Sequence, residues 1–281
     1  MLIFLLAVQV VTAFIFGQLF KWSQRQGCHA PLVVTVNYLV AACLLALILT
    51  WQGGIELSPL VWKVGLSMGC AFTAGMFVMT WALEVSDVAT ILTAFRLSIV
   101  VPIVASVLLW QEEVSTLQLI GIAMALAALL LMSGGKGALL TRRAIFAHGA
   151  LAVAVCIMQG FSLTSSRWVH HAGLDDRHLE VLFVTTATAA AIGTVALLGL
   201  RRVPTWAGLR MGIGIGIFNA GALVLFLAAL ARFQSATFFP ITGCAVVIMD
   251  NIFAHFVWRE RLTRIAWIGA AIGAGSMLLV L

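Results

Sequence analysis

The chain has 281 residues, of which 63% are hydrophobic and 9% are charged, and its formal net charge is +6. Because soluble domains carry about 25% charged residues, this composition excludes a water-soluble fold and indicates a protein that is solvated by lipid. The basic residues lie at the ends of apolar runs, which is typical of membrane proteins and argues against nucleic-acid binding. The five cysteines show no spacing typical of a metal or disulfide site, so we expect neither a metal nor a cofactor.

A membrane-spanning helix needs about 20 mainly apolar residues. Ten runs of the sequence fit this length: 2–20, 31–51, 61–83, 88–110, 116–133, 145–165, 179–200, 206–230, 236–258 and 264–281. The first run lacks the basic segment and the small-residue cleavage site of a signal peptide, so we expect it to be a retained helix. The predicted fold class is an all-α membrane protein with ten transmembrane helices.

The last 47 residues repeat a segment that lies 148 positions earlier, at 87–133. Each copy consists of two apolar helices joined by a short charged elbow, and the register pairs Trp110 with Trp258 and Glu112 with Glu260. We therefore predict two five-helix repeats, 1–134 and 145–281, joined by a glycine-rich basic linker at 135–144. An odd number of helices in each repeat makes the second insert upside down, which gives an inverted repeat.

Each half closes with the pattern Glu-x-(Leu/Val)-(Thr/Ser), at Glu112 and Glu260, and a glycine follows nine residues after the glutamate, at Gly121 and Gly269. With the helix count and the repeat, this pattern resembles the EamA-type members of the drug/metabolite transporter superfamily. The resemblance implies a secondary transporter whose central cavity is lined by helices 1–4 and 6–9 of the ten, with helices 5 and 10 packed outside. It also implies that both termini are cytoplasmic.

The function predicted from these features is export of a small metabolite, such as an amino acid or a drug-like compound, by alternating access. The sequence has no nucleotide-binding loop, so a proton gradient or a counter-substrate would drive transport. The alternative is a flippase of the same fold for a lipid or an isoprenoid-linked substrate. A membrane-embedded enzyme is disfavoured because no catalytic constellation is present. We expect a multi-pass protein of the cell (inner) membrane, surrounded by lipid, as a monomer or a homodimer.

Arg96 in the fourth run and Asp250 in the ninth are charges inside apolar helices, which are costly and therefore suggest function. Counted from the ends of equivalent helices in inverted repeats, the two residues are expected at about the same depth. They form either a substrate site, in which Arg96 binds an anionic group and Asp250 carries a proton or cation, or a static ion pair.

Asn251 and His255 are four residues apart and share a face of the same helix. His255 is either a proton relay or a hydrogen-bonded core residue. The other predicted contacts with substrate are polar or aromatic residues within the apolar runs: Asn37, Trp81, Gln159 and Asn219. Their alternative roles are interhelical hydrogen bonding and, for the tryptophan, anchoring at the membrane interface.

Pro102 and Pro240 interrupt equivalent helices, so we predict a hinge or a fixed bend at each. Glu112 and Glu260 are expected to cap the helix that follows each elbow. The small-residue spacing at Gly208, Gly212 and Gly216 predicts close packing inside the bundle, and that at Gly269 and Gly273 leaves dimerisation open. The histidine- and aspartate-containing segment 170–178 is expected to be a solvated loop rather than a metal site.

The loops after the odd-numbered runs hold eleven basic residues and those after the even-numbered runs hold four. The eleven are Lys21, Arg25, Lys136, Arg142, Arg143, Arg201, Arg202, Arg210, Arg259, Arg261 and Arg264; the four are Lys63, Arg167, Arg177 and Arg232. This bias places the odd loops in the cytoplasm and both termini outside, which conflicts with the orientation that the family resemblance implies.

The linker around Gly137 is therefore predicted to be cytoplasmic, because it carries part of the basic excess. A Gly137→Cys variant, made in a background without the native cysteines, should resist an impermeant thiol reagent in intact cells and react after the cells are opened. Labelling in intact cells would reverse the assigned orientation.

Overall fold

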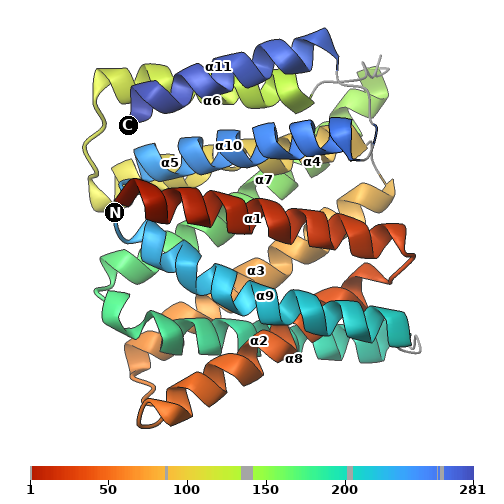
Figure 1. The fold of residues 1–281 in the computed structure, drawn as a ribbon, viewed down its shortest axis with the longest axis vertical. Helices are drawn as coiled ribbons and strands as arrows, with labels where there is room; N and C mark the ends of the chain where they lie inside the picture. Colours follow the sequence, from red (N-terminus) through yellow and green to blue (C-terminus); the bar gives the residue numbers. More distant parts are fainter. Residues whose placement is uncertain (1, 86–87, 134–141, 201–204, 258, 260–262) are drawn as a thin grey trace. The chain divides into compact units, whose positions relative to one another are not determined.

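The computed structural model describes residues 2–281 except 86–87, 134–141, 201–204, 258 and 260–262 (Figure 1). The described residues form α-helices and one short 3₁₀ helix. In chain order these are α1 Leu2–Arg25, α2 Ala30–Trp51, α3 Pro59–Val85, α4 Val88–Leu97, α5 Val100–Trp110, α6 Thr116–Ser133, α7 Arg142–His171, η1 Asp175–Arg177, α8 His178–Leu200, α9 Trp206–Leu230, α10 Ser235–Phe256 and α11 Arg264–Val280.

Eight helical spans among the described residues are long and apolar enough to cross a membrane. One of them, Thr93–Trp110, joins the end of α4 to α5, so the fourth predicted run is interrupted rather than continuous. The apolar helices Thr116–Met132 and Arg264–Val280 are shorter, and they correspond to the fifth and tenth predicted runs. The all-helical membrane class follows from these spans, whereas the count of ten crossings and the inverted repeat stay predictions.

The chain divides into two compact units that do not follow the two sequence repeats. Unit 1 contains Met1–Thr73 and Trp168–Arg232, and unit 2 contains Ala74–Arg167 and Phe233–Leu281. Each unit therefore combines segments from both halves of the sequence, and α3 and α7 each supply residues to both units. Most of the predicted linker 135–144 lies outside the described residues, so the predicted repeat boundary remains a prediction.

In unit 1, α2 packs against both α8 and α9. The glycines of α9 make this contact close, since a Cβ atom on Gly212 would lie 2.7 Å from the Cβ of Val36, and one on Gly216 would lie 2.8 Å from the carbonyl oxygen of Asn37. Gly208 meets Leu32 in the same way. The prediction that these glycines serve packing inside the bundle is confirmed.

In unit 2, α6 and α11 pack against each other through reciprocal contacts. A Cβ atom on Gly121 would lie 2.6 Å from Val280 Cγ1, and one on Gly269 would lie 2.9 Å from Met132 Cγ. Because Gly121 and Met132 become Gly269 and Val280 after a shift of 148 positions, the two helices are related locally by a two-fold arrangement. Gly269 and Gly273 are both covered inside the chain, the latter at 3.5 Å from Ala128, so this face of α11 is not available to a second copy.

The two elbows share backbone features at equivalent positions. Gln111 and Arg259 have φ angles of 54° and 56°, in the left-handed region. Ser115 caps α6 through a capping box with Gln118, in which each backbone N–H bonds the other side chain at 2.9 and 3.2 Å. Thr263, the equivalent of Ser115, accepts a 3.2 Å hydrogen bond from the backbone N–H of Ala266 at the start of α11.

The prediction that Glu112 caps the next helix is wrong, because Ser115 and Gln118 occupy that position. Glu112 instead accepts a 2.9 Å hydrogen bond from the backbone N–H of Ser235, at the start of α10. The reason is geometric, since the left-handed turn at Gln111 directs the elbow toward a helix that begins 123 residues later. Glu260 lies outside the described residues.

Gly269→Ala should destabilise the α6–α11 contact, because its Cβ would meet Leu131 Cβ at 2.9 Å and the Ala128 carbonyl oxygen at 3.0 Å. Such overpacking typically costs about 1–3 kcal/mol. The matched control is Gly275→Ala on the same helix, where the nearest atom is the flexible Cε of Met124 at 3.8 Å. We expect thermal unfolding in detergent to show a lower midpoint for Gly269→Ala than for Gly275→Ala. Equal midpoints would contradict the close contact.

Candidate functional site in helices α4, α5 and α10

The interruption between α4 and α5 follows from Pro102. Proline has no N–H, so it cannot bond the carbonyl of Ser98 four residues earlier. That carbonyl instead accepts a tighter i to i+3 bond of 3.0 Å from Val101, and the Ser98 hydroxyl donates to the Phe95 carbonyl at 2.6 Å. The break therefore lies in the turn before the proline. By contrast α10 runs from Ser235 to Phe256 through Pro240 without a break. Hinge motion at either proline stays a prediction.

Arg96 lies two residues before this break, on the last turn of α4, and is half-buried. Its neighbours on α4, Ile91 and Phe95, pack against α3 and α7 in an apolar cluster that includes Ala82 and Val155. Successive residues of a helix are about 100° apart, so Arg96 projects to a different side from Phe95. The cluster therefore holds α4 in place while leaving the guanidinium outside it.

Two contacts set the register of α4 and α5 against α10. The hydroxyls of Ser106 and Ser235 are 2.6 Å apart, and Ile99 Cδ1 lies 3.5 Å from a Cβ position on Gly243. The helices are antiparallel, so residue numbers fall along one helix as they rise along the other. Continuing the register of these two contacts places residues 245–246 of α10 opposite Arg96. Asp250 therefore lies four to five residues further along, or about 6–7 Å at the helical rise.

Asp250 is half-buried and interacts electrostatically with Arg96. The structure thus brings the two predicted charges into one unit, and counting from these contacts offsets their backbones by about one helical turn. Their relative depth in the membrane stays a prediction. The next residue, Asn251, has a buried side-chain nitrogen (Nδ2) with no hydrogen-bond partner among the described residues. A buried donor of this kind normally has a partner, which points to a bound polar group or water that satisfies it.

The other predicted residues of unit 2 are His255 on α10, Gln159 on α7 and Trp81 on α3. His255 is half-buried between aromatic rings, with centroid distances of 5.1 Å to Phe256 and 6.2 Å to Trp267 of α11. Gln159 on α7 lies near α3, since its Oε1 is 3.5 Å from a Cβ position on Gly75. Trp81 on α3 is 57% exposed. The described contacts of His255 are those of a packed aromatic residue.

Asn37 and Asn219 belong to unit 1, where they lie on the packed helices α2 and α9 and are 1% and 5% exposed. The side-chain oxygen of Asn37 is buried with no hydrogen-bond partner among the described residues. The eight predicted contacts with substrate therefore divide into two in unit 1 and six in unit 2, and a role for each of them in binding stays a prediction.

Segment 170–178 is more ordered than the predicted loop, because α7 continues to His171 and η1 follows. His170 Nδ1 lies 2.7 Å from Asp175 Oδ2. The described residues contain no group of three or more His, Cys, Asp or Glu side chains placed to hold a metal ion.

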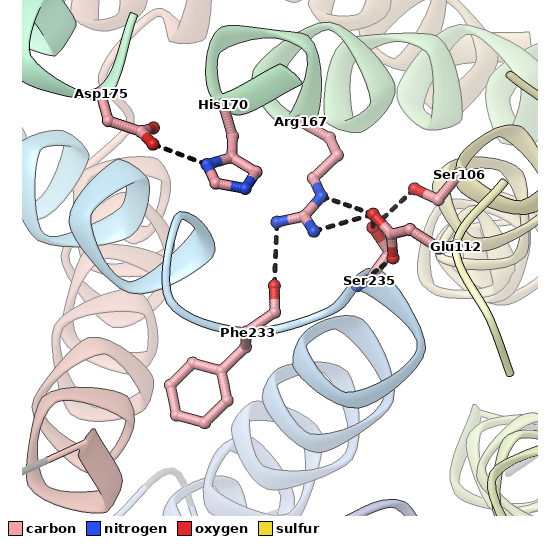
Figure 2. Close-up of polar contacts among 7 residues, drawn as sticks. All are labelled: Ser106, Glu112, Arg167, His170, Asp175, Phe233 and Ser235. Carbon is pink, nitrogen blue, oxygen red and sulfur yellow. Dashed lines mark hydrogen bonds and ion pairs between the residues drawn. The ribbon is translucent and has the colours of Figure 1, made fainter. Parts of the chain in front are cut away.

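Sequence reasoning missed a buried ion pair in unit 2 between Glu112 and Arg167 (Figure 2). Arg167 was assigned to a loop, but it lies in the last part of α7 and is 3% exposed. Its Nε and Nη2 donate to Glu112 Oε1 at 2.9 and 2.7 Å, and its Nη1 donates to the carbonyl oxygen of Phe233 at 2.8 Å. The only sequence signal was a lone arginine just past the end of an apolar run.

Ser235 completes this cluster. Its backbone N–H donates to Glu112 Oε2 at 2.9 Å, its hydroxyl donates to Glu112 Oε1 at 3.2 Å, and Ser106 bonds the same hydroxyl. Figure 2 shows the carboxylate enclosed by these donors. We call Ser106, Glu112, Arg167, Phe233 and Ser235 the elbow cluster.

These helices define a multi-pass helical membrane protein. Residues 1–134 match the EamA-like transporter family, which confirms the resemblance stated from the elbow motifs. An uncharacterized protein of Haemophilus influenzae is 25% identical over 219 residues, covering 76% of this chain and 72% of the relative. A crystal structure at 13% identity has a TM-score of 0.79 and covers 99% of this chain and 96% of that chain, which shows a shared fold.

Glu112→Gln should strongly destabilise the protein, because it removes a buried negative charge opposite a buried guanidinium. Breaking one side of a buried ion pair costs about 3–5 kcal/mol. The double variant Glu112→Leu with Arg167→Met should recover much of that loss. Denaturation in detergent measures both, with Glu113→Gln, an exposed glutamate of the same elbow, as the control. A Glu112→Gln variant as stable as this control would contradict the description.

Proposed function

We propose that the chain is a secondary transporter that moves a small polar metabolite across the membrane by alternating access, as an exporter of an amino acid or a drug-like compound. Two findings support this proposal. The first half of the chain matches a transporter family, and eight helices are suited to crossing a membrane. Transport of this kind uses an ion or substrate gradient, so a proton or a counter-substrate is the proposed coupling partner.

The observation that carries the proposal is the position of opposite charges beside an interrupted helix. Arg96 precedes the α4–α5 break by two residues, and it interacts with Asp250 on α10. In many transporters a broken helix lines the binding site, because its free backbone groups contact ions and polar substrates. Ionisable residues within apolar spanning segments are costly, so retention of these two charges favours a role beyond packing.

In the proposed site, Arg96 binds an anionic group of the substrate through the planar array of donors that guanidinium provides. Asp250 accepts a cationic group or a proton, and the unsatisfied Nδ2 of Asn251 donates to a polar atom of the substrate. His255, Asn37, Trp81, Gln159 and Asn219 remain proposed contacts with the substrate.

The double variant Arg96→Met with Asp250→Leu tests this site. Since both charges are removed together, no uncompensated charge of this pair is left in the apolar helices, and we expect normal expression and thermal stability. Transport should be lost. The measurement is counterflow in proteoliposomes against a panel of radiolabelled amino acids and other small metabolites.

Arg232→Met, which removes an exposed arginine in the turn after α9, is the control and should transport at the rate of the parent. If the double variant folds and transports normally, the two charges form a static pair and the proposed site is wrong. If the parent moves fluorescent lipid between leaflets but none of the panel, the flippase alternative replaces the metabolite transporter.

A further inference from the structure

The chain passes between its two units near the elbow cluster. It leaves unit 2 after Arg167 and returns to it at Phe233. Arg167 itself ties these two points together, because its Nη1 donates to the carbonyl oxygen of Phe233 at 2.8 Å. The same guanidinium binds Glu112, and Glu112 accepts a hydrogen bond from Ser235, the first residue of α10 (Figure 2).

We propose that the elbow cluster is a fixed pivot within unit 2, which stays closed throughout the transport cycle and holds together the two segments of that unit, 74–167 and 233–281. The inference rests on the proposed alternating-access function, because a fixed pivot has meaning only if other parts of the chain move during transport. The opposite assignment for a charged cluster at helix ends is a gate whose ion pair breaks and re-forms in each cycle.

The bonding of the carboxylate favours a pivot over a gate. Both oxygens of Glu112 are used, by two nitrogens of Arg167 and by the N–H and hydroxyl of Ser235. The side chains of Arg167 and Glu112 are only 4% and 8% exposed. Separating Arg167 from Glu112 would leave two buried charges unpaired. It would also remove the carboxylate that accepts from the first backbone N–H of α10, so opening in every cycle is disfavoured.

A second set of hydrogen bonds extends the closed arrangement to α6 and α11. The Nε2 of Gln118 donates to Thr237 Oγ1 at 3.2 Å, and that hydroxyl donates to the carbonyl oxygen of Val280 at 2.8 Å. This bond satisfies one of the free carbonyls at the end of α11. The start of α10 is thus bonded on one side to the elbow and on the other to the end of the last helix.

A disulfide tests whether the cluster must open. The hydroxyls of Ser106 and Ser235 are 2.6 Å apart, near the sulfur separation of about 2 Å in a disulfide, so Ser106→Cys with Ser235→Cys should crosslink on oxidation. In a background without the five native cysteines, the oxidised and reduced forms should show the same initial counterflow of the radiolabelled amino-acid panel. Loss of transport on oxidation that dithiothreitol restores would overturn the pivot.

Thiol labelling provides a second test of the pivot that does not depend on a transport measurement. Ser235→Cys alone, at a position with 0% exposure, should stay unlabelled by N-ethylmaleimide with or without the panel, whereas Glu113→Cys in the exposed part of the same elbow should react. Labelling of Ser235→Cys in the folded protein would show that the cluster opens and would refute the proposal. If the parent transports nothing in the panel, the substrate assignment fails while this labelling still decides the pivot.

Discussion

Unit 2 depends on the interactions of the Glu112 carboxylate with Arg167 and Ser235. In lipid every charge and every free helix end must be satisfied within the protein. The side chain lies in the turn between α5 and α6, yet its partners are in α7 and at the start of α10, 55 and 123 residues away. One buried anion therefore neutralises a buried cation and also fills the hydrogen-bonding positions at a helix N-terminus, where a negative charge is favourable. Ser235, which is bonded to Glu112, also contacts Ser106 of α5, and this contact sets the antiparallel register of α5 and α10.

Close approach of helix backbones supplies the rest of the packing. With no water to drive apolar groups together, helices in lipid associate through shape, and small residues allow the closest contact. Gly121 and Gly269 each receive the end of the opposite helix, and Gly208, Gly212 and Gly216 receive α2. The reciprocal pairing of α6 and α11 explains why these glycines occur at equivalent places in the sequence, since a two-fold contact presents the same steric limit to both helices.

Helix positions could be predicted from hydropathy alone, because lipid selects apolar length and the charged elbows mark the ends; the predicted run 116–133 coincides with α6. The family could be predicted as well, since the elbow motif is local.

The partners of Glu112 could not be predicted, because nothing in a single sequence joins position 112 to positions 167 and 235. The relative depth of Arg96 and Asp250 in the membrane stays a prediction, because counting from helix ends does not include the register that the Ser106–Ser235 contact imposes. The sequence alone predicts an interruption at Pro102. The interruption lies before the proline, because the missing N–H leaves the carbonyl of Ser98 without its helical partner.

The elbow cluster and the proposed binding residues lie at different places along the same helices, and this separation has a mechanical consequence. Arg96 is ten residues before Ser106, and Asp250 is fifteen residues after Ser235, which correspond to about 15 and 22 Å of helix. Between the cluster and Arg96 lies the interruption at Ser98 and Ile99, where α5 is not bonded to α4 by a continuous helical ladder. In the predicted hinge at Pro102, α4 would change direction at this break while the buried ion pair beyond the other end of α5 stays closed. A chain with so few charges thus has one pair, Glu112 and Arg167, enclosed in the elbow cluster and another, Arg96 and Asp250, beside the interruption between α4 and α5.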